Sequence, residues 1–189
     1  MSDNIKVILI GVGYMGREYA KVLKARGNQI IPLGRGNSNA QRFEQEFGIE
    51  VYLNGIENAI KSDNLIPEYA IIAVNVPDLC QVTLSCIGQG IKNILVEKPA
   101  GLGRKEIEKI TEEAEKRRVN VFVAYNRRFY ASVERALQII KEDGGVSSFH
   151  FEFTEWPATV EKTDHSALIK NNWMLCNSTH VIDLAFYLG

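Results

Sequence analysis

The chain has 189 residues, enough for one full domain and part of another, and 46% of them are apolar, which is sufficient for a packed core. Its 22 lysines and arginines nearly balance its 23 aspartates and glutamates, so its charge argues against a nucleic-acid-binding protein. The apolar run near the N-terminus is too short for a signal peptide or a membrane span, and the spacing of the three cysteines fits neither a metal site nor a disulfide framework. We therefore expect a cytoplasmic protein with no membrane association and no bound metal.

Short apolar runs alternate with segments of helical periodicity over the first two thirds of the sequence. Strands are predicted at residues 5–10, 29–33, 69–74, 92–96 and 121–124, with a weaker one at 51–53. Helices are predicted at residues 14–26, 40–47, 78–89 (with Asp78 as the cap) and 104–118. This alternation predicts an α/β fold, a doubly wound Rossmann domain of about six parallel strands with helices on both faces.

The pattern changes after Gly145. Residues 146–154 alternate between apolar and polar side chains, which predicts a strand with one exposed face. Helices are predicted on either side of it, at 131–142 and 178–188. We therefore expect a Rossmann domain over residues 1–125 and the beginning of a second, α+β domain over residues 126–189.

The first glycine-rich turn has the pattern G-x-G-x-x-G, as Gly11-Val12-Gly13-Tyr14-Met15-Gly16. It follows a predicted strand and opens a predicted helix, which is the context in which this pattern binds a dinucleotide. Gly11 permits the tight turn, Gly13 lets a pyrophosphate approach the backbone, and Gly16 lets helix and strand pack closely. The alternative, a glycine turn without a ligand, fits this context less well.

The end of the second predicted strand bears on which dinucleotide is bound. NAD sites usually place an aspartate or glutamate there to hold the ribose 2′-hydroxyl, whereas this chain has Gly34, Arg35 and, further on, Ser38. Arg35 can stack on adenine and neutralise a 2′-phosphate. We therefore expect NADP as the cofactor, with NAD as the second choice; the alternative for Arg35 is a solvated loop charge.

A second group of polar residues, Glu97-Lys98-Pro99, follows the predicted strand at 92–96. Ligands of open α/β sheets bind at this edge, where a lysine can polarise a substrate oxygen beside the nicotinamide. A surface lysine next to a turn is the alternative.

Taken together, the motifs resemble those of the glucose–fructose oxidoreductase, inositol dehydrogenase and rhizopine catabolism family (Gfo/Idh/MocA). The residues that carry the resemblance are, in order, Gly11 to Gly16, Val74-Asn75-Val76-Pro77-Asp78, Glu97-Lys98-Pro99, Asn126-Arg127-Arg128-Phe129 and Ser178-Thr179-His180-Val181-Ile182-Asp183.

The resemblance implies an NAD(P)-dependent oxidoreductase that transfers a hydride between the nicotinamide and a hydroxyl or carbonyl of a sugar, amino sugar or cyclitol. It implies that Lys98 contacts the reacting oxygen and that His180 is the acid/base, although a capping or core histidine is an alternative for His180. The residues expected to contact the dinucleotide are Gly11, Val12, Gly13, Tyr14, Met15, Gly16, Gly34, Arg35, Ser38, Val74, Asn75, Val76, Pro77, Glu97, Lys98 and Asn126. Those expected to contact the substrate are Lys98, Asn126, Arg128, Trp173, Asn177 and His180. Asp183 is expected to be structural.

The sequence departs from the family pattern in three places that matter. Asn75 stands where members often have a threonine or proline, and Cys80 stands where they commonly have a histidine. Cys176 stands where many members have an aspartate four residues before the histidine. Members also continue into an antiparallel sheet that forms one wall of the substrate site and commonly a dimer interface, so residues 126–189 are expected to be an incomplete substrate and dimerisation domain of a homo-oligomer. A fragment is favoured over a natural short form, because an isolated strand leaves an unpaired edge. A non-catalytic dinucleotide sensor remains the alternative to an enzyme, and an interaction module with an empty fold is the least favoured.

Overall fold

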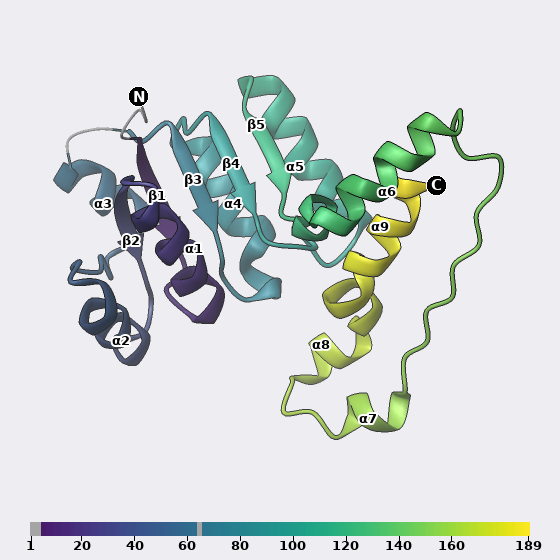
Figure 1. Cartoon of the computed structure of the whole chain (residues 1–189). Helices are drawn as coiled ribbons and strands as arrows, with labels where there is room; N and C mark the ends of the chain where they lie inside the picture. Colours follow the sequence, from purple (N-terminus) through teal and green to yellow (C-terminus); the bar gives the residue numbers. More distant parts are fainter. Residues whose placement is uncertain (1–4, 64–65) are drawn as a thin grey trace. The chain divides into compact units, whose positions relative to one another are not determined.

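The computed structural model describes residues 5–63 and 66–189 and divides the chain into two compact units, Met1–Val123 and Ala124–Gly189 (Figure 1). We call them unit 1 and unit 2 and describe each by itself.

Unit 1 is built on a parallel sheet of five strands, whose order is β2-β1-β3-β4-β5 (Figure 1). The strands are β1 (Lys6–Ile10), β2 (Gln29–Leu33), β3 (Tyr69–Ile72), β4 (Asn93–Val96) and β5 (Asn120–Val123). The first strand, β1, lies between β2 and β3; the chain runs from it outward to the edge strand β2 and returns past β1 to β3, so the direction of winding reverses next to β1. This arrangement confirms the predicted doubly wound Rossmann fold.

Helices cover both faces of the sheet. They are α1 (Tyr14–Ala25), α2 (Asn37–Phe47), α3 (Gly55–Asp63), α4 (Leu79–Gly88) and α5 (Arg104–Arg117), with a short 3-10 turn η1 (Val76–Asp78) before α4. Successive side chains of a strand point to opposite faces. Leu9 accordingly packs with Ala20 and Phe43 of α1 and α2, whereas Ile8 belongs to a second core cluster with Leu79 of α4. Burial on both faces explains why the strands read as continuous apolar runs.

The predicted sixth strand at residues 51–53 is wrong. Tyr52 forms only an isolated parallel bridge with Leu33, and the chain then enters α3, which the sequence analysis did not predict. Helix α2 also begins at Asn37, three residues before its predicted start. Both errors concern short segments, in which tertiary contacts outweigh weak local preferences.

Unit 2 is helical. Its elements are η2 (Asn126–Phe129), α6 (Ala131–Glu142), α7 (Pro157–Glu161), α8 (Ala167–Asn171), the π-helical turn η3 (Met174–Ser178) and α9 (Thr179–Leu188). The helices expected at 131–142 and 178–188 are therefore present, α6 with the predicted bounds, whereas α7 and α8 were not predicted.

The strand predicted at residues 146–154 is wrong. Residues 146–156 contain neither helix nor strand, and unit 2, all of which the structure describes, has no strand for this segment to pair with. The alternating side chains instead contact a helix: the rings of Phe149 and Phe151 lie 5.9 and 6.1 Å from the ring of Phe186 on α9. The alternation therefore reflects one apolar side facing α9, without ladder hydrogen bonds.

Candidate dinucleotide site and the motifs of unit 2

The glycine turn connects β1 to α1, and two of its glycines are required by close approach of the backbone. Gly11 has φ of 101°, and a Cβ there would lie 2.3 Å from the carbonyl oxygen of Ala73. A Cβ on Gly16 would lie 1.9 Å from the carbonyl oxygen of Gly11. These contacts explain the first and third glycines of the motif without any ligand.

Gly13 is different, because neither its backbone conformation nor its neighbours require a glycine at this position. Gly13 is the N-cap of α1 with φ of −73°, which any residue adopts, and a Cβ there would meet nothing within 4 Å. The first turn of α1 contains no acidic residue. Since the N–H groups of a first helical turn have no helical partner and carry positive partial charge, this open space is suited to an anion.

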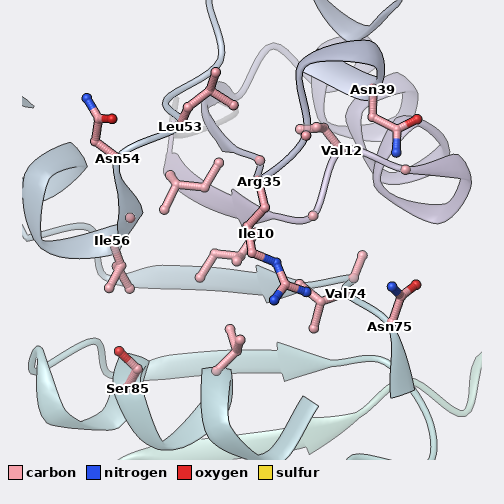
Figure 2. A pocket seen from close by; sticks show the side chains of 18 residues that line it. Ile10, Val12, Arg35, Asn39, Leu53, Asn54, Ile56, Val74, Asn75 and Ser85 are labelled. Carbon is pink, nitrogen blue, oxygen red and sulfur yellow. The ribbon is translucent and has the colours of Figure 1, made fainter. Parts of the chain in front are cut away.

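A cavity of about 650 Å³ lies beside the glycine turn, at the carboxyl ends of β1, β2 and β3 (Figure 2). Several residues expected to contact a dinucleotide line it: Gly11, Val12, Gly13, Gly34, Arg35, Val74 and Asn75. The structure thus brings together three segments far apart in the sequence, the glycine turn and the ends of β2 and β3. An open α/β sheet binds its ligand at such a crevice.

The structure also adds cavity residues that the sequence analysis missed. They include Asn39 of α2, the segment Leu53 to Ile56, and Val82 and Ser85 of α4. The 53–56 segment was missed because α3 was not predicted; the Asn54-Gly55 pair, a common turn signal, was the available clue.

The other expected dinucleotide residues of unit 1 are not among the residues that line this cavity. These are Tyr14, Met15, Gly16, Ser38, Val76, Pro77, Glu97 and Lys98. Tyr14 is 70% exposed and Gly16 is buried against the turn.

Arg35 extends from the end of β2 across the cavity toward Val74 (Figure 2). Its guanidinium Nη2 donates a hydrogen bond to the carboxylate of Asp78, at the end of η1. Asp78 is the residue before α4, as predicted, but its side chain makes no capping hydrogen bond. Among the residues that the structure shows lining the cavity, Arg35 alone is charged, and none is an aspartate or glutamate.

The Glu97-Lys98-Pro99 turn follows β4 at the same edge of the sheet, and its Lys98–Pro99 peptide bond is cis. The Tyr19 hydroxyl on α1 donates a hydrogen bond of 2.6 Å to Glu97 Oε1. Burial, and secondly the neighbouring Glu97, raise the pKa of Tyr19, so the hydroxyl stays protonated as a donor. Lys98 is half-buried.

In unit 2, the Asn-x-Arg-Phe and Ser-x-His motifs lie together. The Arg128 guanidinium makes two hydrogen bonds to the Asp183 carboxylate, one of 2.8 Å from Nε, and lies 4.6 Å from the centre of the Tyr187 ring. The Tyr125 ring meets the half-buried His180 ring edge-on, with centroids 6.0 Å apart. Asp183 therefore pairs with Arg128, which was expected to contact substrate.

Two further residues expected to contact the substrate, Trp173 and Asn177, lie beside or in the π-helical turn, whereas Asn126 begins η2. The Asn177 amide and the Ser178 hydroxyl donate hydrogen bonds of 3.0 and 2.9 Å to Glu155 Oε1, and these bonds hold the pKa of Glu155 below its ordinary value. Trp173 lies 5.5 Å from His165, ring centre to ring centre, Cys176 is buried, and Asn126 is exposed.

In the ranges 5–63 and 66–189, no helix is long and apolar enough to cross a bilayer. Nor does this part of the chain gather three or more His, Cys, Asp or Glu side chains in a metal-binding arrangement.

The fold and the cavity define a Rossmann protein with a glycine turn of the dinucleotide-binding type. Residues 5–125 match the oxidoreductase family with an NAD-binding Rossmann fold, and the chain belongs to this family, Gfo/Idh/MocA. The resemblance drawn from the sequence motifs is thereby confirmed.

Several curated proteins similar to the chain are dehydrogenases. It is 27% identical to the glucose-6-phosphate 3-dehydrogenase of Bacillus subtilis over 97% of this chain and 53% of that protein. The chain spans about half the length of the curated relatives that it matches.

Solved structures share its fold. The WlbA dehydrogenase of Chromobacterium violaceum, in complex with NADH and UDP-GlcNAcA, matches with a TM-score of 0.75 and 14% identity, over all of this chain and 56% of that one. A 3-ketoreductase from Actinomadura kijaniata, in complex with TDP-benzene and NADP, matches with a TM-score of 0.63 and 18% identity, over 76% of this chain and 44% of that one.

Proposed function

We propose that the chain acts as an NADP-dependent oxidoreductase, which transfers a hydride between the nicotinamide and a hydroxyl or carbonyl of a sugar, amino sugar or cyclitol. The observation that carries this proposal is the unfilled space at Gly13, which faces the cavity at the N-terminus of α1. The residues present fit a dinucleotide: backbone N–H groups for the pyrophosphate, an apolar cavity wall and one cation at the end of β2.

The cation supports NADP over NAD. Arg35 carries the only charge among the described cavity-lining residues, and a 2′-phosphate would meet a guanidinium and no carboxylate within that set. An NAD site usually supplies an acidic residue there.

When bound, the nicotinamide supplies the hydride acceptor or donor. In this proposal Lys98 hydrogen-bonds the reacting oxygen and His180 holds the proton that the hydroxyl gains or loses. Glu97 and Asn126 are assigned to the dinucleotide, and Asn126, Arg128, Trp173 and Asn177 to the substrate. Two similar proteins support the sugar class: one is named for a sugar phosphate, and the other was solved in complex with a sugar nucleotide.

Turnover tests this assignment. Purified chain is incubated with NADP and a panel of sugars, sugar phosphates, amino sugars and cyclitols, and reduced nicotinamide is measured by its absorbance. Lys98→Met and His180→Gln should each abolish turnover, and His180→Gln should keep NADPH binding. Lys92→Met is the matched control, because Lys92 is exposed and directly precedes β4. It should keep both turnover and NADPH binding.

A dinucleotide sensor without turnover is the second candidate, and Cys176 favours it. This buried thiol stands at the position of the family's aspartate, and it is a poorer hydrogen-bond acceptor for substrate hydroxyls than a carboxylate. Tight NADPH binding without oxidation of any compound in the panel would support the sensor over the enzyme.

A further inference from the structure

The ion pair between Arg35 and Asp78 links a residue that lines the cavity in unit 1 to one that is not among the lining residues. Arg35 follows β2 and Asp78 follows β3, and these strands flank β1 in the sheet. The two strands are two strand spacings apart, about 10 Å. The pair therefore links the segments that follow the two neighbours of β1, and the glycine turn follows β1 itself.

The carboxylate of Asp78 is not used to cap α4. Asp78 ends the 3-10 turn η1 with helical backbone angles (φ −95°, ψ −13°), and its side chain makes no capping hydrogen bond to α4. The carboxylate is directed to Arg35 instead. The side chain is thus available to act on the cavity's cation.

The pair is weak enough for a ligand to replace. The Arg35 side chain is 71% exposed and that of Asp78 is 35% exposed, and water and salt screen such pairs strongly. A phosphate dianion with three acceptor oxygens is a stronger partner for a guanidinium than one exposed carboxylate. A 2′-phosphate can therefore take Arg35 from Asp78, although it has to displace the carboxylate first.

We propose that Asp78 sets the preference between NADPH and NADH by competing with the 2′-phosphate for Arg35. The inference rests on the proposed function, because it assumes that the cavity binds a dinucleotide. Asp78 lowers the affinity for NADPH, whereas NADH lacks the 2′-phosphate that would compete with Asp78 for Arg35. Neutralising Asp78 releases the arginine and increases the preference for NADPH.

Calorimetric titration of Asp78→Asn with NADPH and NADH tests the proposal. The Kd for NADPH is expected to fall about three- to five-fold, and that for NADH to change less than about two-fold. Asp78→Glu, which keeps the carboxylate, should retain the wild-type ratio of the two Kd values. In an Arg35→Ala background, Asp78→Asn should leave that ratio unchanged, because the contested group is gone.

Glu108→Gln is the matched control, since it breaks the exposed 2.6 Å pair between Arg104 and Glu108 on α5 and removes the same charge. It should not alter the ratio. An unchanged ratio in Asp78→Asn, or an equal change in both affinities, would overturn the competition. Failure of the wild-type chain to bind either dinucleotide would overturn the proposed function itself.

Discussion

The hydroxyl of Tyr19 on α1 donates a 2.6 Å hydrogen bond to Glu97, the residue that precedes Lys98. The two residues are 78 positions apart in the sequence. The bond ties the helix that follows the glycine turn to the turn after β4. The candidate phosphate-binding helix and the candidate catalytic lysine are therefore parts of one hydrogen-bonded framework within unit 1.

Removing the Tyr19 hydroxyl should destabilise the chain. Tyr19→Phe leaves a partly buried carboxylate with one donor fewer, and we expect the free energy of unfolding to fall by about 1–2 kcal/mol. Denaturant unfolding measures this, with Tyr14→Phe as the control, because Tyr14 is 70% exposed. Equal losses in the two variants would show that the bond has no special contribution.

The glycines of the turn should respond differently to alanine. Gly13→Ala keeps the fold, since its Cβ enters open space, but the methyl group lies where the pyrophosphate approaches. We expect the Kd for NADPH to rise at least about ten-fold, which is about 1.4 kcal/mol, with little change in the unfolding temperature.

Gly11→Ala is the matched comparison. Its Cβ would collide with the Ala73 carbonyl at a φ of 101°, so we expect a loss of stability of more than about 2 kcal/mol. A Gly13→Ala variant that binds NADPH as tightly as wild type would show that no ligand occupies the space beside Gly13.

The pair between Arg128 and Asp183 should stabilise unit 2. Asp183→Asn removes the charge of a carboxylate that receives two hydrogen bonds, and the free energy of unfolding should fall by about 1–2 kcal/mol. Arg128→Lys should also destabilise, because an ammonium cannot make both bonds in one plane or stack on Tyr187. Asp143→Asn, an exposed residue after α6, is the control for lost charge and should change stability by less than about 0.5 kcal/mol.

Acid should weaken the contact of Glu155 with the π-helical turn. Hydrogen bonds from Asn177 and Ser178 lower the pKa of Glu155 in the folded chain. A group whose folded pKa is lowered stabilises the fold above its unfolded pKa, about 4.3 for glutamate, and this contribution is lost as the pH falls through the folded pKa.

The gap in unfolding temperature between wild type and Glu155→Gln should therefore be largest near neutral pH and close on acidification. Thermal unfolding from about pH 7 to pH 3 measures it, with Glu152→Gln on the same segment as control. A gap that stays constant over this range would contradict the assigned contact.

Much of unit 1 could be predicted from the sequence because its strands are buried on both faces. The run Gln29–Leu33 was predicted with its observed bounds, and the other strands differ from prediction only at their ends. Helix α3 could not be predicted, because its few apolar residues, such as Ile56, pack on the sheet without a long periodic pattern. At residues 146–154 a strand was predicted that is absent. An alternating pattern shows that one side of a segment is apolar, but not which element packs against that side.

The candidate site likewise has one part that could be predicted from the sequence and one part that could not. The glycine turn and Arg35 could be placed from local motifs, because a strand, a tight turn and a helix follow one another directly. The pairing of Arg35 with Asp78, of Tyr19 with Glu97 and of Arg128 with Asp183 could not, because each joins residues at least 43 positions apart. Such pairs depend on which strands are neighbours, and a single sequence does not state this.

The most direct test of the account is titration of the purified chain with NADPH and NADH, followed by calorimetry or by fluorescence of the reduced nicotinamide. The account predicts saturable, micromolar binding with NADPH preferred, and loss of that preference in Arg35→Ala. A preference for NADH would contradict the role given to Arg35, and the absence of binding by either dinucleotide would contradict the central claim that the cavity beside Gly13 is a dinucleotide site.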